Sequence, residues 1–570
     1  MRKQFKGSVF TILALTAVLV SIFGASFAFA KGQSHADAHA HVATSSQHAI
    51  APMVSMHTVD MRGVPAESAS SAKLPARTMP RLTGVSPAVY AQRKAAALHN
   101  KNAPVNANPA QTTPNTPTTL AKFKGMADSA SICPYFGGCQ PPDQALATSP
   151  NWVLQGVNTS FAVFSTTGIR QTGWPKKAQN FFGVPNPGSC DTHGPFLSDP
   201  RAFYDPKDGR FWVAMLQVEG AFGLNSCPES TLYWIAVSQT NNPNGLWNVY
   251  AFNMALGTTN AADYTQFGFD QTAIYFSANM FNQAGTAYVY AESFSALKST
   301  MEAGAAVTAF GFSHFTANGV LVDTVQPVEN EASSGPGVGL LINSFNMNGD
   351  GTHNCVSTAC SGLVVWAIAN PGTASASLSG VIASTSIKYI NPPSANEPGC
   401  SGCIETLDTR ISGTPVYQAG TIAFALESAI KNSTQNVPGI FWGLVQPTIS
   451  GGKITGATVT LNGTLAFSGN QAASFPTMMQ TKTGNLLMVF DTMSSTLDPS
   501  IMYATRLTTD IGGFEAAKFL KKSITATNNS RWGDYEATSY DGTTTNNVWF
   551  SAQYSGGNAD WATFIGKVNF

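Results

Sequence analysis

Charged residues are scarce in this sequence of 570 residues, in which Lys, Arg, Asp and Glu together account for 11%. The 31 basic and 31 acidic residues balance to a formal net charge of zero. Without a net positive charge, the chain lacks the broad basic field that holds the phosphates of nucleic acid. We therefore expect no nucleic-acid partner.

Long apolar runs are absent after the first thirty residues. Basic residues near the start precede a largely apolar stretch, and Ala28-Phe29-Ala30 follows it. This order is typical of an export signal with its cleavage site. We expect residues 1–30 to be a signal peptide, although an uncleaved membrane anchor has a similar pattern. No later stretch is long and apolar enough to span a bilayer, so the chain without its signal is not expected to cross a membrane.

The motifs of several enzyme classes are also missing. The sequence has no G-x-G-x-x-G or G-x-x-x-x-G-K-[ST] motif for a nucleotide, and no G-x-S-x-G motif in a strand-turn-helix setting for a serine hydrolase. After residue 117 the histidines are His193, His314 and His353, which are too few and too scattered to favour a copper or zinc enzyme.

Residues 31–117 lack the alternation of apolar and polar residues that marks strands. They are rich in Ala, Ser, Thr, Pro and Asn. A segment of this composition buries too little apolar surface to offset the entropy lost on ordering. We expect a disordered, low-complexity spacer or a cleaved propeptide, with one short helical patch at residues 87–99.

Eight cysteines follow the predicted signal, and they fall into neighbouring pairs. An even number in an exported chain predicts disulfides that close loops. The expected pairs are Cys133 with Cys139, Cys190 with Cys227, Cys355 with Cys360, and Cys400 with Cys403. The last pair would close a tight ring and could instead stay reduced. The alternative is a zinc site formed by the last four cysteines, whose two halves are far apart for a compact zinc module.

One sequence unit recurs along residues 118–570. The stretch RWGDYEATSYDGTTTNNVWFSAQY, residues 531–554, contains an acid, an alternating strand, an Asp-Gly turn and a second strand with paired aromatics. Related stretches begin at Asp199 and Asp263, and the copies share a second Asp at positions 205, 270 and 541. A pair of short strands cannot bury both faces alone, so this recurrence indicates an array of stacked sheets.

Seven such units can be placed, opening at residues 143, 199, 263, 329, 408, 475 and 534. Their spacing suits four short strands with turns, and the 51 glycines and 32 prolines supply turn residues. The last unit shows three strands, and the run at residues 118–125 is available as its fourth. We predict an all-β fold, a β-propeller of seven four-stranded blades closed by this N-terminal strand, with six or eight blades as alternatives.

The units that open at Asp143, Asp199 and Asp263, together with the RWGDYEAT run at residues 531–538, resemble secreted bacterial β-propellers that are sialidase-like in the broad sense. More narrowly, they are similar to a mostly uncharacterised exported family whose last blade reads RWGDY-x-A-T. The resemblance covers residues 118–570 and implies a fold rather than one activity, because propellers host many functions. The S-x-D-x-G-x-x-W turns of true sialidases are missing.

Three arginines lie two or three residues from an acid that opens a unit, in the pairs Asp199 with Arg201, Asp408 with Arg410, and Asp534 with Arg531. Residues two apart on a strand share a face, so the first two pairs should each point one way. The first strands of propeller blades line the axis, so the arginines could converge and bind a carboxylate or sulfate. Tyr535 and Glu536 are further candidates for ligand contact. Alternatively, each arginine pairs with a nearby Asp and holds the ring together.

Two groups of oxygen donors could hold calcium. The unit-opening acids, Asp143 and Asp263 among them, could coordinate a cation in the channel, or could accept hydrogen bonds from backbone N–H groups at strand starts. In NMNGDGTH, Asn346, Asn348 and Asp350 have the spacing of the start of an EF-hand loop. The twelfth position is Ser357 rather than the required Glu, and an Asn/Gly-rich hairpin turn explains the run equally well.

The sequence thus predicts an exported, extracellular propeller whose axial mouth binds a glycan or protein ligand. The alternative function is a glycoside hydrolase, sialidase-like, acting on an acidic glycan. A pair of carboxyl groups beside a deep cleft would favour hydrolysis. A mouth filled by Asp–Arg pairs would favour binding or a structural role.

Overall fold

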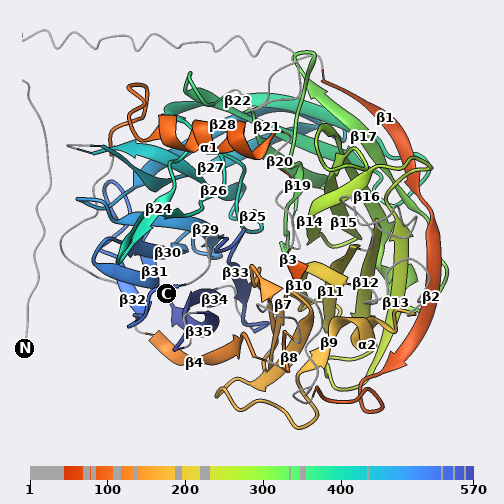
Figure 1. Cartoon of the computed structure of the whole chain (residues 1–570). Coiled ribbons are helices and arrows are strands. Elements are labelled where there is room, and N and C mark those ends of the chain that lie inside the picture. The colour runs from red at the N-terminus through yellow and green to blue at the C-terminus, as the bar shows by residue number, and fades with distance from the viewer. Residues whose placement is uncertain are drawn as a thin grey trace, which may run out of the picture. The chain divides into compact units, whose positions relative to one another are not determined.

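Strands joined by tight turns build seven antiparallel sheets, which stand as blades around one axis (Figure 1). Each blade is built on four antiparallel strands that run from the innermost at the axis to the outermost at the rim, and in six blades these four follow one another along the chain. Middle strands such as β15 (Ala273–Phe281) and β30 (Leu486–Ser494) are buried at every position, because both of their faces pack against neighbouring blades. The predicted seven-bladed β-propeller is confirmed.

This computed structural model describes most of the chain. All described residues belong to the unit that spans residues 41–570. Outside the described residues lie the predicted signal peptide, Cys190, Cys227, Asn348 and Asp350. The described ranges are 44–67, 77–78, 82, 85–106, 117, 119–129, 131–133, 139–185, 196–218, 231–332, 335–346, 355–432, 435–527, 531–543, 546–557 and 560–570.

The first three blades follow one another along the chain, and short helices lie in two of their connections. From axis to rim, the strands of blade 1 are β6 (Ala145–Thr148), β7 (Trp152–Val157), β8 (Ser160–Ser165) and β9 (Lys176–Lys177); those of blade 2 are β10 (Phe196–Asp205), β11 (Arg210–Val218), β12 (Leu232–Ser238) and β13 (Leu246–Asn253); those of blade 3 are β14 (Ala261–Phe269), β15, β16 (Tyr288–Leu297) and β17 (Ala309–Ala317). Helix α2 (Ala178–Phe182) follows β9, helix α3 (Lys298–Glu302) follows β16, and β18 (Val320–Leu321) pairs with β17.

The remaining blades have the same strand order, and one extra hairpin lies between blades 4 and 5. The strands of blade 4 are β19 (Gln326–Pro327), β20 (Gly339–Ser344), β21 (Cys360–Ala369) and β22 (Ser377–Tyr389); those of blade 5 are β25 (Val416–Gln418), β26 (Thr421–Lys431), β27 (Asn436–Ser450) and β28 (Lys453–Leu465); those of blade 6 are β29 (Ala472–Gln480), β30, β31 (Leu497–Arg506) and β32 (Lys518–Lys521); those of blade 7 are β33 (Ala537–Tyr540), β34 (Asn547–Ser555), β35 (Trp561–Asn569) and β4 (Thr119–Ala127). The hairpin consists of β23 (Ala395–Glu397) and β24 (Cys400–Ile404).

The ring closes where β4, from the N-terminal part of the chain, pairs with β35 from the C-terminal end. This confirms the predicted closing strand. A buried hydrogen-bond network joins the closure to blade 1: Gln155 Oε1 accepts from Met126 N (2.9 Å), and Gln155 Nε2 donates to Ser551 Oγ (2.8 Å) and Thr563 Oγ1 (2.9 Å). Closure therefore depends on polar contacts shared by blade 1, blade 7 and β4 as well as on strand pairing.

Replacement of Gly125 by valine should weaken this closure. A Cβ atom at Gly125 would lie 2.5 Å from Gln155 Oε1 and would also collide with Thr563 Oγ1. We expect the free energy of unfolding, measured by chemical denaturation, to fall by about 2–4 kcal/mol, because the added side chain breaks the network. Gly557→Val is the matched control, since an added Cβ meets no atom within 4 Å there. Equal stability of the two variants would contradict this view of the closure.

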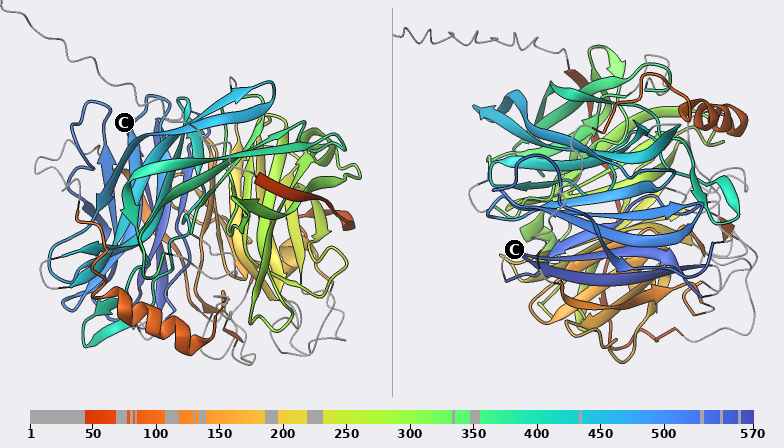
Figure 2. Two further views of the ribbon diagram at one scale, coloured as in Figure 1. Left: turned by 90° about the horizontal axis from the view of Figure 1, so that it is seen from above. Right: turned by 90° about the vertical axis from the view of Figure 1, so that its left-hand side faces the viewer.

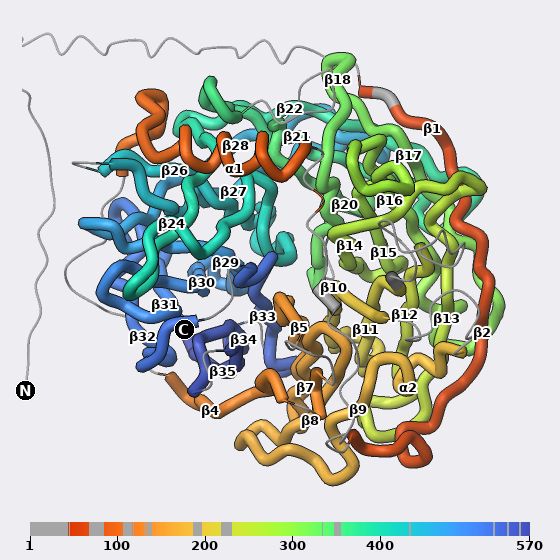
Figure 3. Tube along the Cα trace, viewed as in Figure 1, coloured from red at the N-terminus to blue at the C-terminus, as the bar shows by residue number. Residues whose placement is uncertain are grey.

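Part of the predicted spacer is ordered and belongs to the propeller. β1 (Thr44–Ala51) pairs with β17 and β2 (Met53–Asp60) pairs with β13, so each adds an outermost strand to a blade. Figure 3 shows both strands along the rim of the ring. The prediction of a spacer over residues 31–117 is therefore wrong for residues 44–60. The exposed and half-buried positions of β2 do alternate, but Ser, His and Thr share them with Val and Met.

The predicted helical patch is confirmed as α1 (Pro87–Ala97), which lies against one end of the ring (Figure 2). Ser86 caps the helix by accepting a hydrogen bond from Val89 N, and Pro87 occupies its first turn. Lys94 is 5% exposed and donates to Pro392 O (3.0 Å) and Thr406 Oγ1 (2.7 Å). The helix is thus fixed to the segment that leads to Asp408.

The recurring second acids of the sequence units have a structural role at the ends of the innermost strands. In each, one carboxylate oxygen accepts a backbone N–H two residues further on: Asp205 from Lys207, Asp270 from Thr272, and Asp541 from Thr543, at 2.7–2.9 Å. Such Asx turns stabilise the tight hairpin that starts the second strand.

Among the described residues, no helix is long and apolar enough to cross a membrane.

Candidate functional site

Near the start of several innermost strands, one residue other than glycine has a left-handed backbone conformation, with a positive φ angle. This residue lies either just before the strand or within it. In blades 2, 3 and 6 this residue sits in a register shift of the strand. Such a backbone costs about 1–3 kcal/mol for each residue unless its surroundings compensate. The residues are Asp143 (φ 37°), Asp199 (φ 56°), Tyr264 (φ 52°), Thr324 (φ 50°) and Phe475 (φ 53°).

The compensation is a hydrogen bond from the preceding blade. Asn158 Oδ1 accepts from Asp199 N at 2.8 Å, and Asn279 Oδ1 accepts from Thr324 N at 2.7 Å. Glu427 Oε1 accepts from Phe475 N at 2.6 Å in the same way. These contacts tie neighbouring blades together at the end of the axis where the innermost strands begin.

We call this end of the axis the N-side mouth. Contacts between five blades define it: Asp143 Oδ1 accepts from Asp534 N (3.0 Å), Asp199 Oδ2 accepts from Thr265 N (3.3 Å), and Ser412 Oγ donates to Asp534 O (3.2 Å). The structure therefore brings together most of the candidates from the sequence. Its members are Asp143, Asp199, Arg201, Asp263, Tyr264, Asp408, Arg410, Arg531, Asp534 and Tyr535.

Arg410 is committed to a single partner. Its Nε donates to Asp408 Oδ1 (2.9 Å), its Nη2 donates to Asp408 Oδ2 (2.7 Å), and its backbone N–H donates to Oδ1 (2.9 Å). The two residues lie in a bend rather than on a strand, so the expected strand alternation is wrong for this pair. Burial alone would lower the pKa of Arg410, but the Asp408 carboxylate outweighs it and the pKa is raised well above its ordinary value. This pair fits the structural alternative.

Arg531 is only partly engaged. Its Nη2 donates to Asp534 Oδ2 at 2.8 Å, as the sequence spacing suggested. Its Nε and Nη1 atoms are buried and have no hydrogen-bond partner in the described part of the chain. An unpartnered buried donor on a cation is costly, so these atoms are suited to bind an acceptor from outside.

The guanidinium group of Arg201 lies over an aromatic ring. Its guanidinium carbon is 3.4 Å from the ring centre of Tyr535 and 5.9 Å from that of Tyr264. Its Nε donates to Thr265 O at 3.1 Å, whereas Nη2 is buried without a partner among the described residues. Tyr264 also contacts Arg410, at 4.5 Å, so one ring lies between two of the three arginines.

Two buried acids of the mouth, Asp143 and Asp199, hold their protons more tightly than free carboxyl groups. Burial, and then the neighbouring carboxyl of Asp534, raise the pKa of both Asp143 and Asp199. Both also accept hydrogen bonds: Asp143 Oδ2 from Asn158 Nδ2 at 2.8 Å, and Asp199 Oδ1 from Ser198 Oγ at 2.9 Å. Asp143 and Asp199 therefore fit the expected role of accepting hydrogen bonds at the starts of strands.

Asp263 differs from the other four acids of the mouth because its side chain is half-buried rather than buried. Its carboxyl has no hydrogen bond or ion pair among the described residues. Burial, together with Asp199 and Asp534, raises the pKa of Asp263 to about 8. At neutral pH this carboxyl is therefore largely protonated and can donate as well as accept a hydrogen bond.

The side chains of Tyr535 and Glu536 have different surroundings. Tyr535 lines the mouth under Arg201 and donates to Pro200 O at 3.1 Å. Glu536 is 1% exposed, accepts from Gln144 Nε2 at 2.5 Å, and shares a side-chain hydrogen bond with Asp491. The prediction that Glu536 contacts ligand is not supported by this burial. Asp491 was missed, although a lone acid in the apolar run LLMVFDTMS is a visible signal.

The described residues cover only part of the candidate calcium ligands, because Asn348 and Asp350 lie outside them. Among the described residues, three metal-ligand atoms lie within 4.8 Å of one another only in the group Asp205, Asp208 and Glu302, so Asp143 and Asp263 do not form such a group. Lys298 Nζ contacts Asp205 and lies 3.1 Å from Asp208, which places an ammonium ion within that group. Asn346 is fully buried and donates to Thr409 Oγ1 at 3.3 Å.

Two of the predicted disulfides are present, Cys133–Cys139 and Cys355–Cys360. The structure contradicts the third described pair, because Cys400 and Cys403 are free thiols. Burial, and then Cys400 and Glu397, raise the pKa of Cys403 to about 12. The two bridges and two thiols also exclude the four-cysteine zinc site.

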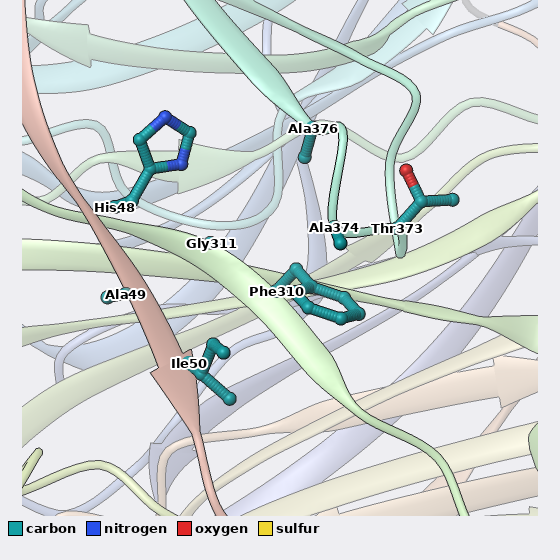
Figure 4. A pocket seen from close by; sticks show the side chains of 8 residues that line it. All are labelled: His48, Ala49, Ile50, Phe310, Gly311, Thr373, Ala374 and Ala376. Carbon is teal, nitrogen blue, oxygen red and sulfur yellow. The ribbon is translucent and has the colours of Figure 1, made fainter.

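An open groove of about 550 Å³ lies at the rim, away from the predicted residues. It is lined by β1, β17 and the loop before β22, with His48, Ile50 and Phe310 around it (Figure 4). No residue of the N-side mouth contributes to it. Trp174, Trp247 and Trp561, which could have stacked on sugars at a surface, are all buried in the cores between blades.

No protein-family model matches the sequence, and no curated protein matches it either. Solved structures that resemble the fold include the α-L-arabinanase of Penicillium chrysogenum (10% identity, 80% of this chain and 99% of that chain, TM-score 0.36). Others are extracellular domains 1–2 of Drosophila Semaphorin 1b (9% identity, 81% and 88%, TM-score 0.33) and the endosialidase of phage phi92 (6% identity, 75% and 67%, TM-score 0.31). At these values the likeness concerns the fold alone.

Proposed function

We propose that this protein is an extracellular β-propeller that binds an acidic carbohydrate at its N-side mouth. The observation that carries the proposal is the set of unpartnered guanidinium donors, Nη2 of Arg201 and Nε and Nη1 of Arg531. Planar guanidinium groups suit the oxygens of a carboxylate or sulfate group. An acidic sugar would satisfy donors that the described part of the chain leaves open.

The acids beside these arginines support a carbohydrate over a simple anion. Asp263 presents a half-buried carboxyl that both donates and accepts near neutral pH. Sugar hydroxyl groups also both donate and accept, so they can pair with such a carboxyl and with the neighbouring carboxyl groups. A bare sulfate or phosphate ion has only acceptor oxygens and would be repelled by any carboxylate that stays ionised.

The proposed location is outside the cell. Disulfides form and persist in oxidising compartments, and two are present among the described residues. The export signal predicted at residues 1–30 agrees with this location. The ligand would then be a glycan of the surroundings or of a cell surface, with no nucleic acid involved.

Calorimetric titration with uronic-acid oligosaccharides tests the proposal. We expect wild type to bind them more tightly than neutral oligosaccharides, and Arg531→Lys and Arg201→Lys to bind at least about tenfold more weakly. Lysine keeps the positive charge beside Asp534 or Tyr535 but loses the planar fork of donors. Arg506→Lys is the matched control, because Arg506 donates to Gly512 O and Asp510 O near the end of β31. Equal affinity of all variants, or no binding by wild type, would contradict the proposal.

A second candidate function is hydrolysis of the same class of glycan. The specific observation in its favour is the raised pKa of Asp263, because a carboxyl that is protonated near neutral pH can act as a general acid. A second carboxyl group nearby, such as that of Asp534, would serve as the base or nucleophile. New reducing ends released during the titration would favour this function, and their absence would leave binding alone.

A further inference from the structure

The opposite end of the axis, the C-side mouth, is where the innermost strands end. It contains Asp205 at the end of β10, Asp270 after β14, Glu329 and Glu331 after β19, and Asp541 after β33. Figure 1 shows these strands side by side around the centre of the ring. Acidic residues of blades 2, 3, 4 and 7 therefore lie at this end of the axis.

Three of these five acids already have partners. Asp205 contacts Lys298 Nζ, Asp541 Oδ2 accepts from Asn547 Nδ2 (2.6 Å) and lies 3.3 Å from Lys567 Nζ, and Asp270 Oδ2 accepts from Tyr275 Oη (2.6 Å). Their remaining oxygens hold the Asx turns described above. These acids are accounted for by the fold.

Glu329 and Glu331 are held by their backbones. Glu329 N donates to Pro415 O at 2.8 Å, and Tyr417 N donates to Glu329 O at 2.8 Å, which pairs this residue with blade 5. Glu331 O accepts from Gln271 Nε2 of blade 3 at 3.1 Å. The two side chains therefore start from fixed positions.

Glu329 and Glu331 interact with residues of blades that are not neighbours of blade 4. Val328, which precedes Glu329 just after β19, packs into the core between blades 4 and 5. Asp205 of blade 2 and Tyr540 of blade 7 both lie close enough to interact electrostatically with these glutamates. The space that these blades share is the axis itself.

Neither glutamate has a counter-charge in the described part of the chain. Glu329 is 6% exposed, yet its carboxyl makes no hydrogen bond or ion pair there. Three described lysines near this mouth have other partners: Lys298 contacts Asp205 and Asp208, Lys567 lies beside Asp541, and Lys207 Nζ donates to Gln271 O at 3.0 Å. A buried carboxyl without a partner must either keep its proton or gain a cation.

We propose that the C-side mouth binds one divalent cation of the calcium type, with the carboxylates of Glu329 and Glu331 as its protein ligands. All the candidate donors around them are hard oxygen atoms, which Ca²⁺ prefers. This site differs from the group Asp205, Asp208 and Glu302, which Lys298 already occupies.

Titration of chelator-treated protein with CaCl₂, followed by calorimetry, tests this site. We expect one Ca²⁺ per chain with a dissociation constant of about 0.1–1 mM, as in extracellular modules. Tb³⁺ should bind at the same place and emit on excitation of nearby tyrosines such as Tyr540. The double variant Glu329→Gln/Glu331→Gln should bind at least about tenfold more weakly. Glutamine has nearly the same volume and removes two uncompensated charges, so this variant should fold.

Two controls locate the cation. Glu302→Gln changes the group formed by Asp205, Asp208 and Glu302, which Lys298 already occupies, and this variant should leave Ca²⁺ binding unchanged. Asp143→Asn/Asp263→Asn, at the other mouth, should leave it unchanged as well. The proposal is overturned if wild type gives no binding heat, if the double glutamine variant binds like wild type, or if the loss appears only in the Asp143→Asn/Asp263→Asn variant.

Discussion

Arg410→Met should lower the free energy of unfolding by about 3–5 kcal/mol, because it leaves the Asp408 carboxylate buried without its counter-charge. Both side chains are less than a tenth exposed and are joined by two side-chain hydrogen bonds. The guanidinium also lies 4.5 Å from the ring of Tyr264, so packing is lost as well. Chemical denaturation at neutral pH measures the change.

A double variant distinguishes the loss of one partner from the removal of the whole ion pair. Asp408→Asn combined with Arg410→Met removes both charges and keeps an oxygen that can accept from the backbone N–H of residue 410. Such replacements of whole buried pairs are often close to neutral, so the double variant should recover most of the loss. If Arg410→Met alone has the same free energy of unfolding as wild type, the Asp408–Arg410 pair does not stabilise the propeller ring.

Stability should fall as pH rises from about 4 to about 8. Asp491 is fully buried, and burial raises its pKa to about 8 from an ordinary value near 3.8. Its neighbour Glu536 also has a raised pKa, chiefly from burial and then from Asp491. The folded state thus holds protons that the unfolded state has released, so its advantage is complete below pH 4 and is lost as pH approaches 8.

Asp491→Asn should remove one of these titrations. The free energy of unfolding changes by at most about 1.4 kcal/mol per pH unit for each proton, so the variant should show a shallower slope between pH 5 and pH 8. Asparagine can still accept the 2.7 Å hydrogen bond from Trp532 Nε1. Asp498→Asn, at a half-buried position of β31, is the control and should keep the slope of wild type. A variant slope as steep as that of wild type would show that Asp491 does not titrate in this range.

The propeller was predictable because its units repeat. Each blade needs four strands, and the recurring acid, turn and aromatic strand fixed the number and spacing of the blades. Strands β1 and β2 escaped prediction because they occur once, outside the repeat, and their alternating positions are filled by Ser, His and Thr as well as apolar residues. Pairing to a blade edge, rather than their own apolar content, orders them.

The site was predictable in its members but not in their roles. Proximity of each arginine to an acid in the sequence correctly grouped Arg201, Arg410 and Arg531 near Asp199, Asp408 and Asp534. The sequence could not distinguish Arg410, whose Nε and Nη2 donate to Asp408, from Arg531, whose Nε and Nη1 are open. That difference depends on local turns and on left-handed residues such as Tyr264, which no spacing rule reveals.

The most direct test of this division among the arginines is one titration series with a uronic-acid oligosaccharide, comparing wild type, Arg531→Lys and the double variant Asp408→Asn/Arg410→Met. If Arg201 and Arg531 bind the ligand while Arg410 holds the ring, the double variant keeps an affinity within about threefold of wild type, and Arg531→Lys loses at least about tenfold. Equal losses in both variants, with both folded, would contradict the account.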